Sequence, residues 1–264
     1  MGRAVAARFA ANGMAVLCAD LNEPAAQAVA NGLTAAGHPA CAVRTDITDE
    51  ASVAAMAAAA INWAGRIDTC IANAGAMIEG DILSLSLTDW NRAMLVNATG
   101  AFLTARAVLP HLLVQGGTLV FTATTVDLSG MKGVAAYLPA KGAVMALTRQ
   151  LAADFAARGV RVNAVAPGAV RTPLSESQFR ARAADEAEFQ TLLAQVIGRY
   201  PISRWGTPEE IAEGMLFLAT DRSSWMTGQI IPIDGGLLEL RQAPRSARSK
   251  ARFGRWDARA ETSF

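Results

Sequence analysis

Two side chains near the middle of the chain have the types and the spacing that suit acid–base chemistry. Tyr137 and Lys141 lie four residues apart in the segment AAYLPAKGAV. On a helix this spacing places both side chains on one face, one turn apart. A nearby positive charge favours the phenolate and lowers a tyrosine pKa from its reference value of about 10. We therefore expect Lys141 to lower the pKa of Tyr137, so that the phenol exchanges a proton with an alcohol near neutral pH.

The surroundings of the pair favour this interpretation. The same spacing also occurs by chance, as a half-buried ring beside a solvated charge, so the pair alone does not establish a site. Here, however, a short apolar strand at residues 118–122 and a loop rich in threonine precede an alanine-rich helix predicted over residues 135–158. Passages from strand through loop to helix form the active sites of α/β proteins. The chain has only two tyrosines, and one of them lies just after this loop.

The rest of the chain alternates between apolar runs and helical patterns. Strands are predicted over residues 14–20, 40–45, 67–72, 118–122, 160–165 and 229–233. Helices are predicted over residues 2–12, 23–36, 49–64, 88–114 and 135–158, with weaker signals over 175–197. A further helix should begin at Thr207, because Thr207, Pro208 and Glu210 follow the capping-box pattern. This alternation predicts α/β architecture: a single doubly wound parallel sheet with helices on both faces.

Composition excludes several classes of function. The 264 residues are 52% hydrophobic and carry a formal net charge of +1, which gives no general attraction to nucleic acid or membranes. Cys18, Cys41 and Cys70 lie in predicted strands without the spacing of a zinc site, so we expect buried thiols and no metal. No run has the uninterrupted apolar length of a membrane span, and the N-terminus lacks a secretory pattern. These features favour a cytoplasmic protein.

The ends of the predicted strands hold the candidate binding residues, because ligands of doubly wound sheets bind beyond the carboxyl ends of the strands. Asp20 would accept hydrogen bonds from the ribose hydroxyls of a dinucleotide and repel a 2′-phosphate, which favours NAD over NADP. It also suits an ordinary acidic turn. Gly75 and Gly168 would let the backbone approach a cofactor closely, or simply form turns. The strand ends are Asp20, Asp46, Asn73-Ala74-Gly75, Thr124 and Pro167-Gly168.

Taken in this order, the residues resemble the short-chain dehydrogenase/reductase family from residue 2 to residue 236. Asn73-Ala74-Gly75 resembles the last three positions of the family's Asn-Asn-Ala-Gly motif, and Tyr137 and Lys141 resemble its Tyr-x-x-x-Lys pair. Asn97, in LVNATGAF, matches the family's catalytic asparagine, which holds a water in the proton relay. The resemblance implies that Tyr137 exchanges the proton with substrate oxygen and that Lys141 also holds the nicotinamide ribose.

The resemblance extends to the cofactor site. Asp46 and Ile47 resemble the pair that flanks adenine. Arg161-Val162-Asn163 with Pro167-Gly168 and Thr172 resembles the segment around the nicotinamide. The implied cofactor-binding residues are Gly2, Asp20, Asp46, Ile47, Asn73, Ala74, Gly75, Tyr137, Lys141, Pro167, Gly168, Val170 and Thr172. The implied cofactor is NAD.

Two departures from the family pattern lie close to Tyr137. The family's active-site serine falls at Thr124, with Thr125 as an alternative. A threonine hydroxyl donates the same hydrogen bond to a substrate oxygen, but its β-branch crowds the site and predicts a narrower range of substrates. The motif also contains Pro139, which is tolerated if it lies in the first turn of the helix.

The third departure is at the start of the chain. The family opens with a strand and a Thr-Gly-x-x-x-Gly-x-Gly loop whose backbone cradles the pyrophosphate. Gly2 corresponds to the last glycine of that loop. The resemblance therefore implies that the first strand and most of the loop are missing. Because that strand is central, we expect two unpaired apolar edges. Our hypothesis is that Met1 is an internal methionine of a longer reading frame, which the intact mass of the native protein tests.

The resemblance leaves three functions open. The leading one is an NAD-dependent oxidoreductase that interconverts a secondary alcohol and a ketone. Alternatives are a non-catalytic or truncated relative that cannot hold the dinucleotide, and an NADP-dependent ketoreductase of the 3-oxoacyl thioester type, which Asp20 disfavours. Residues 174–200 should form a mobile lid over a small-molecule substrate that the sequence does not name, and the helices at 88–114 and 135–158 should pack a homotetramer or a dimer. A basic extension, predicted to be floppy, covers residues 237–264.

Overall fold

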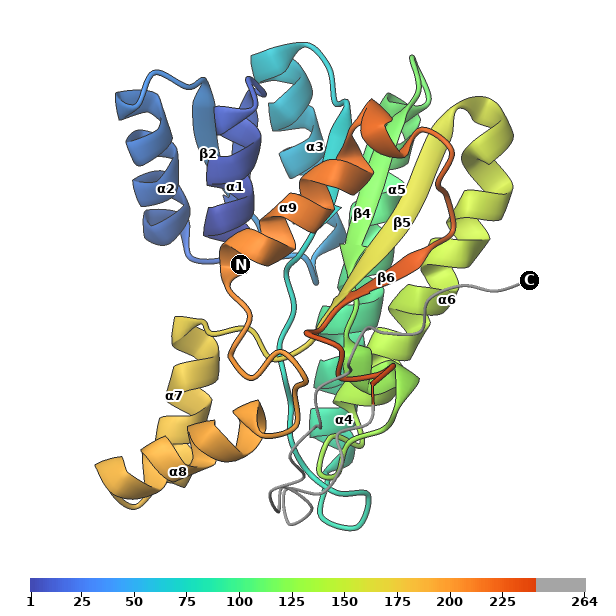
Figure 1. The fold of residues 1–264 in the computed structure, drawn as a ribbon. Helices are drawn as coiled ribbons and strands as arrows, with labels where there is room; N and C mark the ends of the chain where they lie inside the picture. The colour runs from blue at the N-terminus through green and yellow to red at the C-terminus, as the bar shows by residue number, and fades with distance from the viewer. Residues whose placement is uncertain (241–264) are drawn as a thin grey trace, which may run out of the picture.

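Parallel strands form the centre of the molecule, in two separate hydrogen-bonded sheets. The computed structural model describes residues 1–240. Its strands are β1 (Val16–Asp20), β2 (Ala40–Arg44), β3 (Thr69–Ala72), β4 (Gly117–Thr122), β5 (Val160–Pro167) and β6 (Ile230–Ile233). β1 pairs with β2, and the other four follow the order β3-β4-β5-β6, with every pair parallel (Figure 1). The expected α/β fold is thus confirmed. The expected single sheet, however, is split into two sheets, because β1 and β3 are not hydrogen-bonded to each other or to a common strand.

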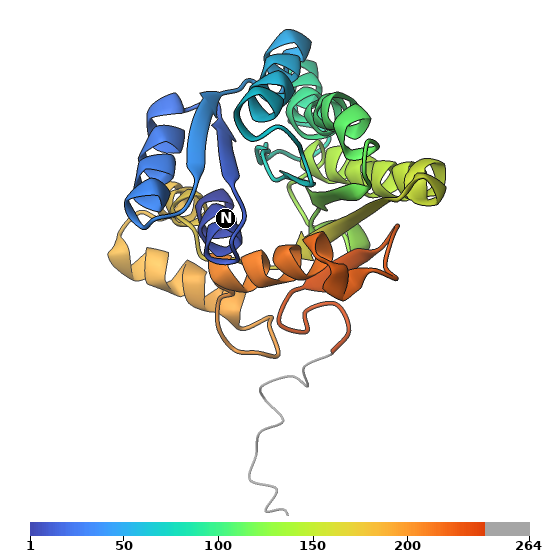
Figure 2. The ribbon, with the colours of Figure 1, turned by 90° about the horizontal axis from the view of Figure 1, so that it is seen from above.

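Helices cover both faces of these strands. One side carries α3 (Glu50–Ala64), α5 (Gly100–Leu112) and α6 (Tyr137–Phe155), whose apolar residues share a core with β4 and β5. The other side carries α1 (Gly2–Ala11) and α9 (Pro208–Ala219), which pack on each other and on β4 and β5, while α2 (Glu23–Ala35) packs on β1 and β2. Figure 2 shows the β1–β2 pair and the larger sheet enclosed by these helices.

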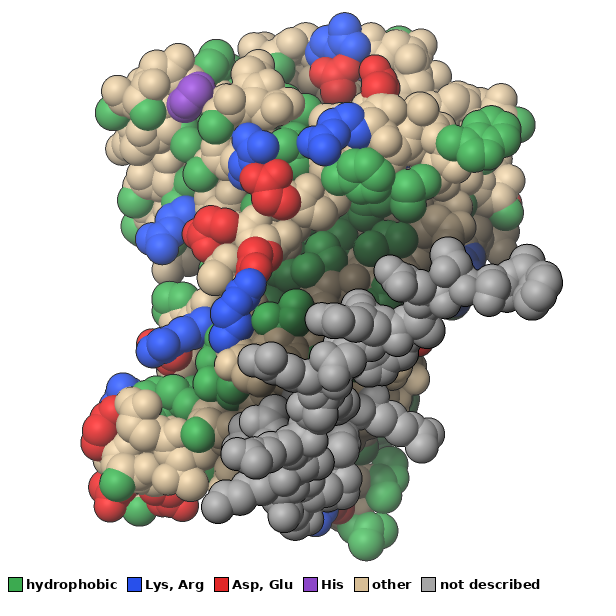
Figure 3. Space-filling model, in the orientation of Figure 1, with side chains coloured by type: hydrophobic (Ala, Val, Ile, Leu, Met, Phe, Trp, Pro, Cys, Tyr) green, Lys and Arg blue, Asp and Glu red, His purple; other side chains and the backbone are tan. Residues whose placement is uncertain are grey.

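Three more helices lie outside the two layers. α4 (Leu87–Ala93) leads into α5, and α7 (Pro173–Arg182) and α8 (Glu186–Ile197) pack together beyond the end of β5 (Figure 1). The weak helical signals at residues 175–197 therefore correspond to two helices. On the face shown in Figure 3, basic and acidic side chains are interspersed, and an ion pair between Arg8 and Glu213 joins α1 to α9.

Local capping explains where several helices begin. The capping box predicted at Thr207 is confirmed, because the Thr207 hydroxyl accepts from Glu210 N and the Glu210 carboxylate accepts from Thr207 N. α6 begins at Tyr137, so Pro139 lies in its first turn, where no amide donor is required. The helix expected from residue 88 begins instead at Leu87, because Ser86 rather than Thr88 caps it.

The helix predicted over residues 88–114 is interrupted. Residues Met94–Thr99 adopt π-helical geometry between α4 and α5. Such π segments are rare and occur frequently at functional sites. The whole run Leu87–Leu112 is also long and apolar enough to cross a membrane, which the sequence prediction missed. It packs against α3, α6 and the strands, however, as a core helix does.

Burial differs sharply between the strands. Every residue of β4 and β5 is fully buried except Gly117 and Arg161, whereas β1, β2 and β3 contain no fully buried residue. Cys18, Cys41 and Cys70 lie in β1, β2 and β3. Their side chains are half-buried, so the prediction of buried thiols was wrong. The tail predicted as floppy lies, from residue 241 onward, outside the described residues.

Candidate active site

Lys141 is the most deeply buried charged group of the predicted site. Its side chain is 4% exposed on α6, and its Nζ donates to the Thr122 carbonyl at 2.8 Å, where β4 ends. Burial lowers the pKa of Lys141 to about 8, and the negative charge of Asp127 opposes that shift. An ammonium group has three donors, so Lys141 retains the capacity to bind hydroxyl oxygens.

The pKa of Tyr137 moves opposite to the expected direction. Burial and the charge of Asp127 raise it to about 12, against a smaller lowering by the hydrogen bond with the Thr124 hydroxyl. We expected Lys141 to lower it. The prediction was wrong because it considered only the neighbour on the same helix face, whereas tertiary packing removes the phenol from water and adds a carboxyl group. Tyr137 is therefore a protonated phenol at neutral pH.

The two candidate threonines take different positions. Thr124 is 9% exposed, shares a hydrogen bond with Tyr137 and caps the 3₁₀ turn Thr125–Leu128. Thr125 is 1% exposed, and its hydroxyl donates to the Pro167 carbonyl at 3.2 Å. Thr125 thus joins β5 to the loop after β4, while Thr124 is the one whose hydroxyl lies beside the phenol. The catalytic role of Thr124 stays a prediction.

Asn97 lies in the π segment and is 1% exposed. Its Nδ2 donates to Ala76 O at 2.8 Å and to Ala93 O at 3.1 Å, and its Oδ1 accepts from Ala76 N at 3.2 Å. The side chain therefore clamps the segment that follows β3. That segment runs very close to the site, because a Cβ at Gly75 would lie 2.7 Å from Asn97 Oδ1 and 3.2 Å from Lys141 Nζ. Only glycine fits there, and the predicted relay water at Asn97 stays a prediction.

The first turn of α1 lies next to the end of β3. A Cβ at Gly2 would lie 3.3 Å from Asn73 Nδ2, and Asn73 Oδ1 accepts from the Thr122 hydroxyl at 3.3 Å. Ala74 follows, exposed, between Asn73 and Gly75. The amino end of a helix attracts anions through its free amide donors and its dipole. The structure thus brings Gly2 and the β3 end together, as a dinucleotide site requires.

The acidic residues at the ends of β1 and β2 differ in availability. Asp20 is exposed, and its Oδ1 accepts from Asn22 N at 2.9 Å. Asp46 instead accepts from both the amide and the hydroxyl of Thr48, at 2.9 and 2.6 Å, and these bonds lower its pKa. Ile47 packs on α5, since a Cβ at Gly100 would lie 2.8 Å from Ile47 Cδ1. Asp20 is therefore the more exposed of the two carboxylates and accepts fewer hydrogen bonds than Asp46.

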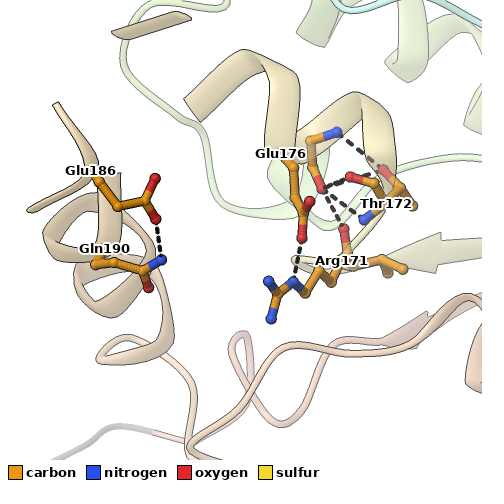
Figure 4. Close-up of polar contacts among 7 residues, drawn as sticks. Arg171, Thr172, Glu176, Glu186 and Gln190 are labelled. Atoms are coloured by element: carbon orange, nitrogen blue, oxygen red, sulfur yellow. Dashed lines mark hydrogen bonds and ion pairs between the residues drawn. The ribbon is translucent and has the colours of Figure 1, made fainter. Parts of the chain in front are cut away.

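The segment after β5 is held by contacts with residues later in the chain and by a helix cap of its own. A Cβ at Gly168 would lie 2.9 Å from both Asp234 Cα and Tyr200 Cε1, so this glycine serves close packing. Val170 is 8% exposed and bridges to Gly206. Thr172 caps α7 through a reciprocal pair of hydrogen bonds with Ser175. Figure 4 shows Thr172 next to the ion pair between Arg171 and Glu176.

Sequence reasoning missed two residues. Tyr200, the second tyrosine, accepts from Ala169 N at 2.8 Å and so fixes the loop that follows Pro167. Asp127 lies in the 3₁₀ turn after Thr124, and its electrostatic interactions reach both Tyr137 and Lys141. An acid three residues after Thr124 was a usable signal for Asp127, whereas nothing in the sequence indicated a partner for Tyr200. Among residues 1–240, no group of three or more His, Cys, Asp or Glu side chains could hold a metal ion.

Comparison with known proteins identifies the family. The family model described as enoyl-(acyl carrier protein) reductase matches residues 1–238. 2-(S)-Hydroxypropyl-CoM dehydrogenase 3 of Xanthobacter autotrophicus is 36% identical over 91% of this chain and 93% of its own. Meso-2,3-butanediol dehydrogenase of Serratia marcescens is 37% identical over 89% of each chain. A short-chain dehydrogenase/reductase structure from Burkholderia xenovorans matches with a TM-score of 0.86 and 32% identity over 91% of each chain.

The chain belongs to the short-chain dehydrogenase/reductase family. As a member, it is an oxidoreductase with a Rossmann-like fold, and dehydrogenases of this family use nicotinamide cofactors. The residues at the strand ends fit such a group. The N–H donors of the buried Lys141 suit ribose hydroxyls. Gly75 has no side chain, so its backbone is accessible to a cofactor. The amino end of α1 at Gly2 suits a phosphate.

Proposed function

We propose that this short-chain dehydrogenase/reductase interconverts a secondary alcohol and a ketone with NAD as the hydride carrier. The observation that supports this best is the group formed by Thr124, Tyr137 and Lys141 near the end of β4. Thr124 and Lys141 are buried, the half-buried Tyr137 shares a hydrogen bond with the Thr124 hydroxyl, and Lys141 donates to the Thr122 carbonyl. When bound, the nicotinamide would supply or accept the hydride. The chain's own residues would bind the substrate and transfer the proton.

The raised pKa of Tyr137 fits the direction of carbonyl reduction. A phenol that stays protonated at neutral pH can donate its proton to the substrate oxygen as the alkoxide forms. Thr124 would donate a hydrogen bond to the same oxygen, and Lys141 would hold ribose hydroxyls beside it. Asn97 would organise the relay water and the Gly75 segment. Alcohol oxidation requires the phenolate and is therefore favoured at alkaline pH.

The exposed carboxylate of Asp20 supports NAD rather than NADP. It lies at the carboxyl end of β1, and would repel a 2′-phosphate while accepting from ribose hydroxyls. This disfavours the alternative of an NADP-dependent ketoreductase. We further propose a cytoplasmic protein whose α4–α5 helix pairs with a second copy, since Leu87, Leu95 and Phe102 on that helix are 73%, 44% and 43% exposed.

A second candidate is a folded but non-catalytic relative, and the divided sheet favours it. Within residues 1–240 no strand pairs with both β1 and β3, so each of these two strands has one unpaired edge. The glycine-rich loop of the family would connect a strand at this position to α1. Binding of NADH, measured by cofactor fluorescence, separates the two candidates, because the non-catalytic relative should not bind at micromolar concentration.

The test of the catalytic assignment is Tyr137→Phe. Removing the hydroxyl should lower kcat by about 10²- to 10⁴-fold, the range typical of a lost general acid or base, because no other group donates that proton. NADH affinity and the circular-dichroism spectrum should be retained. Trp225→Phe, at a position that is 99% exposed, serves as a control for aromatic substitution. Retained turnover in a folded Tyr137→Phe variant would reject the proposed function.

A further inference from the structure

An ion pair joins α7 to the segment that follows β3. Arg182, in the last turn of α7, contacts the carboxylate of Glu79, which lies 103 positions earlier in the chain. The ion pair between Arg8 and Glu213 joins α1 to α9, two helices that already pack on each other. α7 instead packs on α8, and both helices lie outside the two layers (Figure 1). The Glu79–Arg182 pair thus connects these outer helices to the body of the molecule.

The Glu79 side of the pair is fixed to the proposed reaction centre. Three residues before Glu79, the Ala76 backbone is clamped by the Asn97 side chain. One residue after Glu79, the Gly80 carbonyl accepts from Ala135 N at 3.1 Å, and α6 begins with the proposed proton donor two residues later. Because both ends of this short segment are held by residues of the site, Glu79 has a fixed place beside it.

The amino end of α7 is tied to the other side of the same centre. Thr172 caps this helix shortly after Pro167, whose carbonyl accepts from the Thr125 hydroxyl at 3.2 Å. Thr125 adjoins Thr124 in the loop after β4. α7 therefore runs from the loop that carries Thr124 to the segment that follows β3, where the ion pair of Arg182 closes the connection.

Ring and ion-pair contacts make α7 and α8 one unit around Arg182. The Arg182 guanidinium carbon lies 5.4 Å from the centre of the Phe179 ring, and Phe179 meets Trp205 edge-to-face with the ring centres 5.6 Å apart. Arg180 donates to the Glu186 carboxylate of α8 at 2.7 Å. A displacement of Arg182 from its partner therefore affects both helices and their contact with Trp205.

The contacts that hold α7 in place are opposed by a buried donor. The Arg182 and Glu79 side chains are 46% and 39% exposed, and ion pairs as exposed as this one contribute little to stability. Trp205 Nε1 is shielded from solvent and has no hydrogen-bond partner among residues 1–240. An unpaired buried donor costs free energy, which water would relieve if α7 moved away from Trp205. The position of α7 is thus a balance that one ion pair can shift.

We propose that Glu79 and Arg182 are positioning residues whose ion pair latches α7 and α8 beside the Thr124–Tyr137–Lys141 group and opens during turnover to admit substrate and release product. The role in turnover rests on the proposed function, since that function gives the group beside α7 its reaction. The latch assigns to two named residues, on opposite sides of the centre, the control of a movement that opening and closing segments of enzymes often make.

The first measurement is amide hydrogen exchange of the peptide that spans residues 173–182, made on the full chain by mass spectrometry. Glu79→Gln and Arg182→Gln should each speed its exchange about two- to fivefold, the factor expected for the loss of one exposed ion pair. The double variant should exchange no faster than Arg182→Gln alone, because the two residues share one contact. Exchange in α6 should stay as in the wild type. Arg8→Gln, which breaks the pair with Glu213, should leave α7 unchanged.

Initial rates with 2-butanol and NAD measure the role of the latch in the reaction. In Glu79→Gln and Arg182→Gln the KM for 2-butanol should rise about two- to fivefold, because an open α7 retains the alcohol less well. The value of kcat should not fall, because the groups that transfer the proton are intact and opening is easier.

Three results overturn the latch. The first is wild-type exchange of residues 173–182 in both single variants. The second is an additive acceleration in the double variant, or one that spreads to α6, because the two residues then act separately or stabilise the whole fold. The third is an unchanged KM in variants whose α7 exchanges faster. Hydrogen exchange needs no turnover, so it also decides about the latch if the wild type does not oxidise 2-butanol and the proposed function fails for that alcohol.

Discussion

The β4–β5 region and the β1–β2 region are built from similarly apolar strands, yet they are buried to very different degrees. In β4 and β5 nearly every residue is shielded, whereas β1 and β2 contain half-buried and exposed residues throughout. The difference comes from pairing and covering. β4 and β5 each have a strand on both sides and helices on both faces, while β1 has a strand partner only on the β2 side.

The difference in burial between the two regions matches the chemical roles that we propose for their residues. Thr124, Tyr137 and Lys141 are anchored on β4 and α6, where packing fixes their positions. Asp20 and Asp46, the predicted partners of the adenosine end, lie on the less buried strands. Proton transfer requires side chains held to within a fraction of an ångström, whereas ribose recognition by an exposed carboxylate tolerates more movement. We therefore expect the region with the most buried contacts to carry the proposed reaction.

The largest expected difference between the two regions is a loss of stability on truncating a matched pair of leucines. Leu119 in β4 is 0% exposed, and Leu17 in β1 is half-buried. Leu119→Ala should lower the free energy of unfolding by about 2–5 kcal/mol, because it leaves a cavity in a closed core. Leu17→Ala should cost about 1 kcal/mol, because solvent already reaches that strand. Urea denaturation measures both, and equal losses would contradict the structural comparison.

A smaller and pH-dependent effect is expected at Asp127. Burial raises the pKa of Asp127 from 3.8 to about 7, so between these pH values the folded protein binds more protons than the unfolded chain. The contribution of the Asp127 carboxyl group to the free energy of unfolding of the wild type therefore falls as the pH rises toward 7. Asp127→Asn should be more stable than the wild type by about 1–2 kcal/mol at pH 8 and by almost nothing at pH 4. The value at pH 8 is smaller than the full pKa shift implies, because the Asp127 side chain is only partly buried and solvent screens its charge.

Urea denaturation of the two proteins at both pH values measures this difference, with Asp154→Asn as the exposed control. A stability difference that is independent of pH would mean that the Asp127 carboxyl group is not held in an unfavourable environment.

The smallest effect concerns the β1–β2 region. Asp20→Ser should weaken NADH binding about tenfold, the effect of one exposed charge-assisted hydrogen bond, and should leave NADPH binding unchanged or improved. Fluorescence titration with the two cofactors measures the ratio. Glu23→Gln, an exposed acid at the start of α2, should keep the wild-type preference. An equal loss for both cofactors would show that Asp20 shapes the loop rather than reading the ribose.

The sequence by itself determined what depends on neighbours along the chain. The capping box at Thr207, the strand ends and the spacing of Tyr137 and Lys141 were all readable, because helix caps and periodicity involve residues within a few positions. The motifs around Asn73, Asn97 and Tyr137 also indicated the family before any contact between them was known.

Only the tertiary structure decided what depends on distant residues and on burial. It divided the sheet between β1 and β3, directed the Lys141 ammonium to the Thr122 carbonyl, raised the pKa of Tyr137 instead of lowering it, and left Asp127 without a partner. The free energy of a charge or a hydrogen bond depends on how much water packing removes around it. Packing joins elements that are far apart in the chain, so no local pattern encodes it.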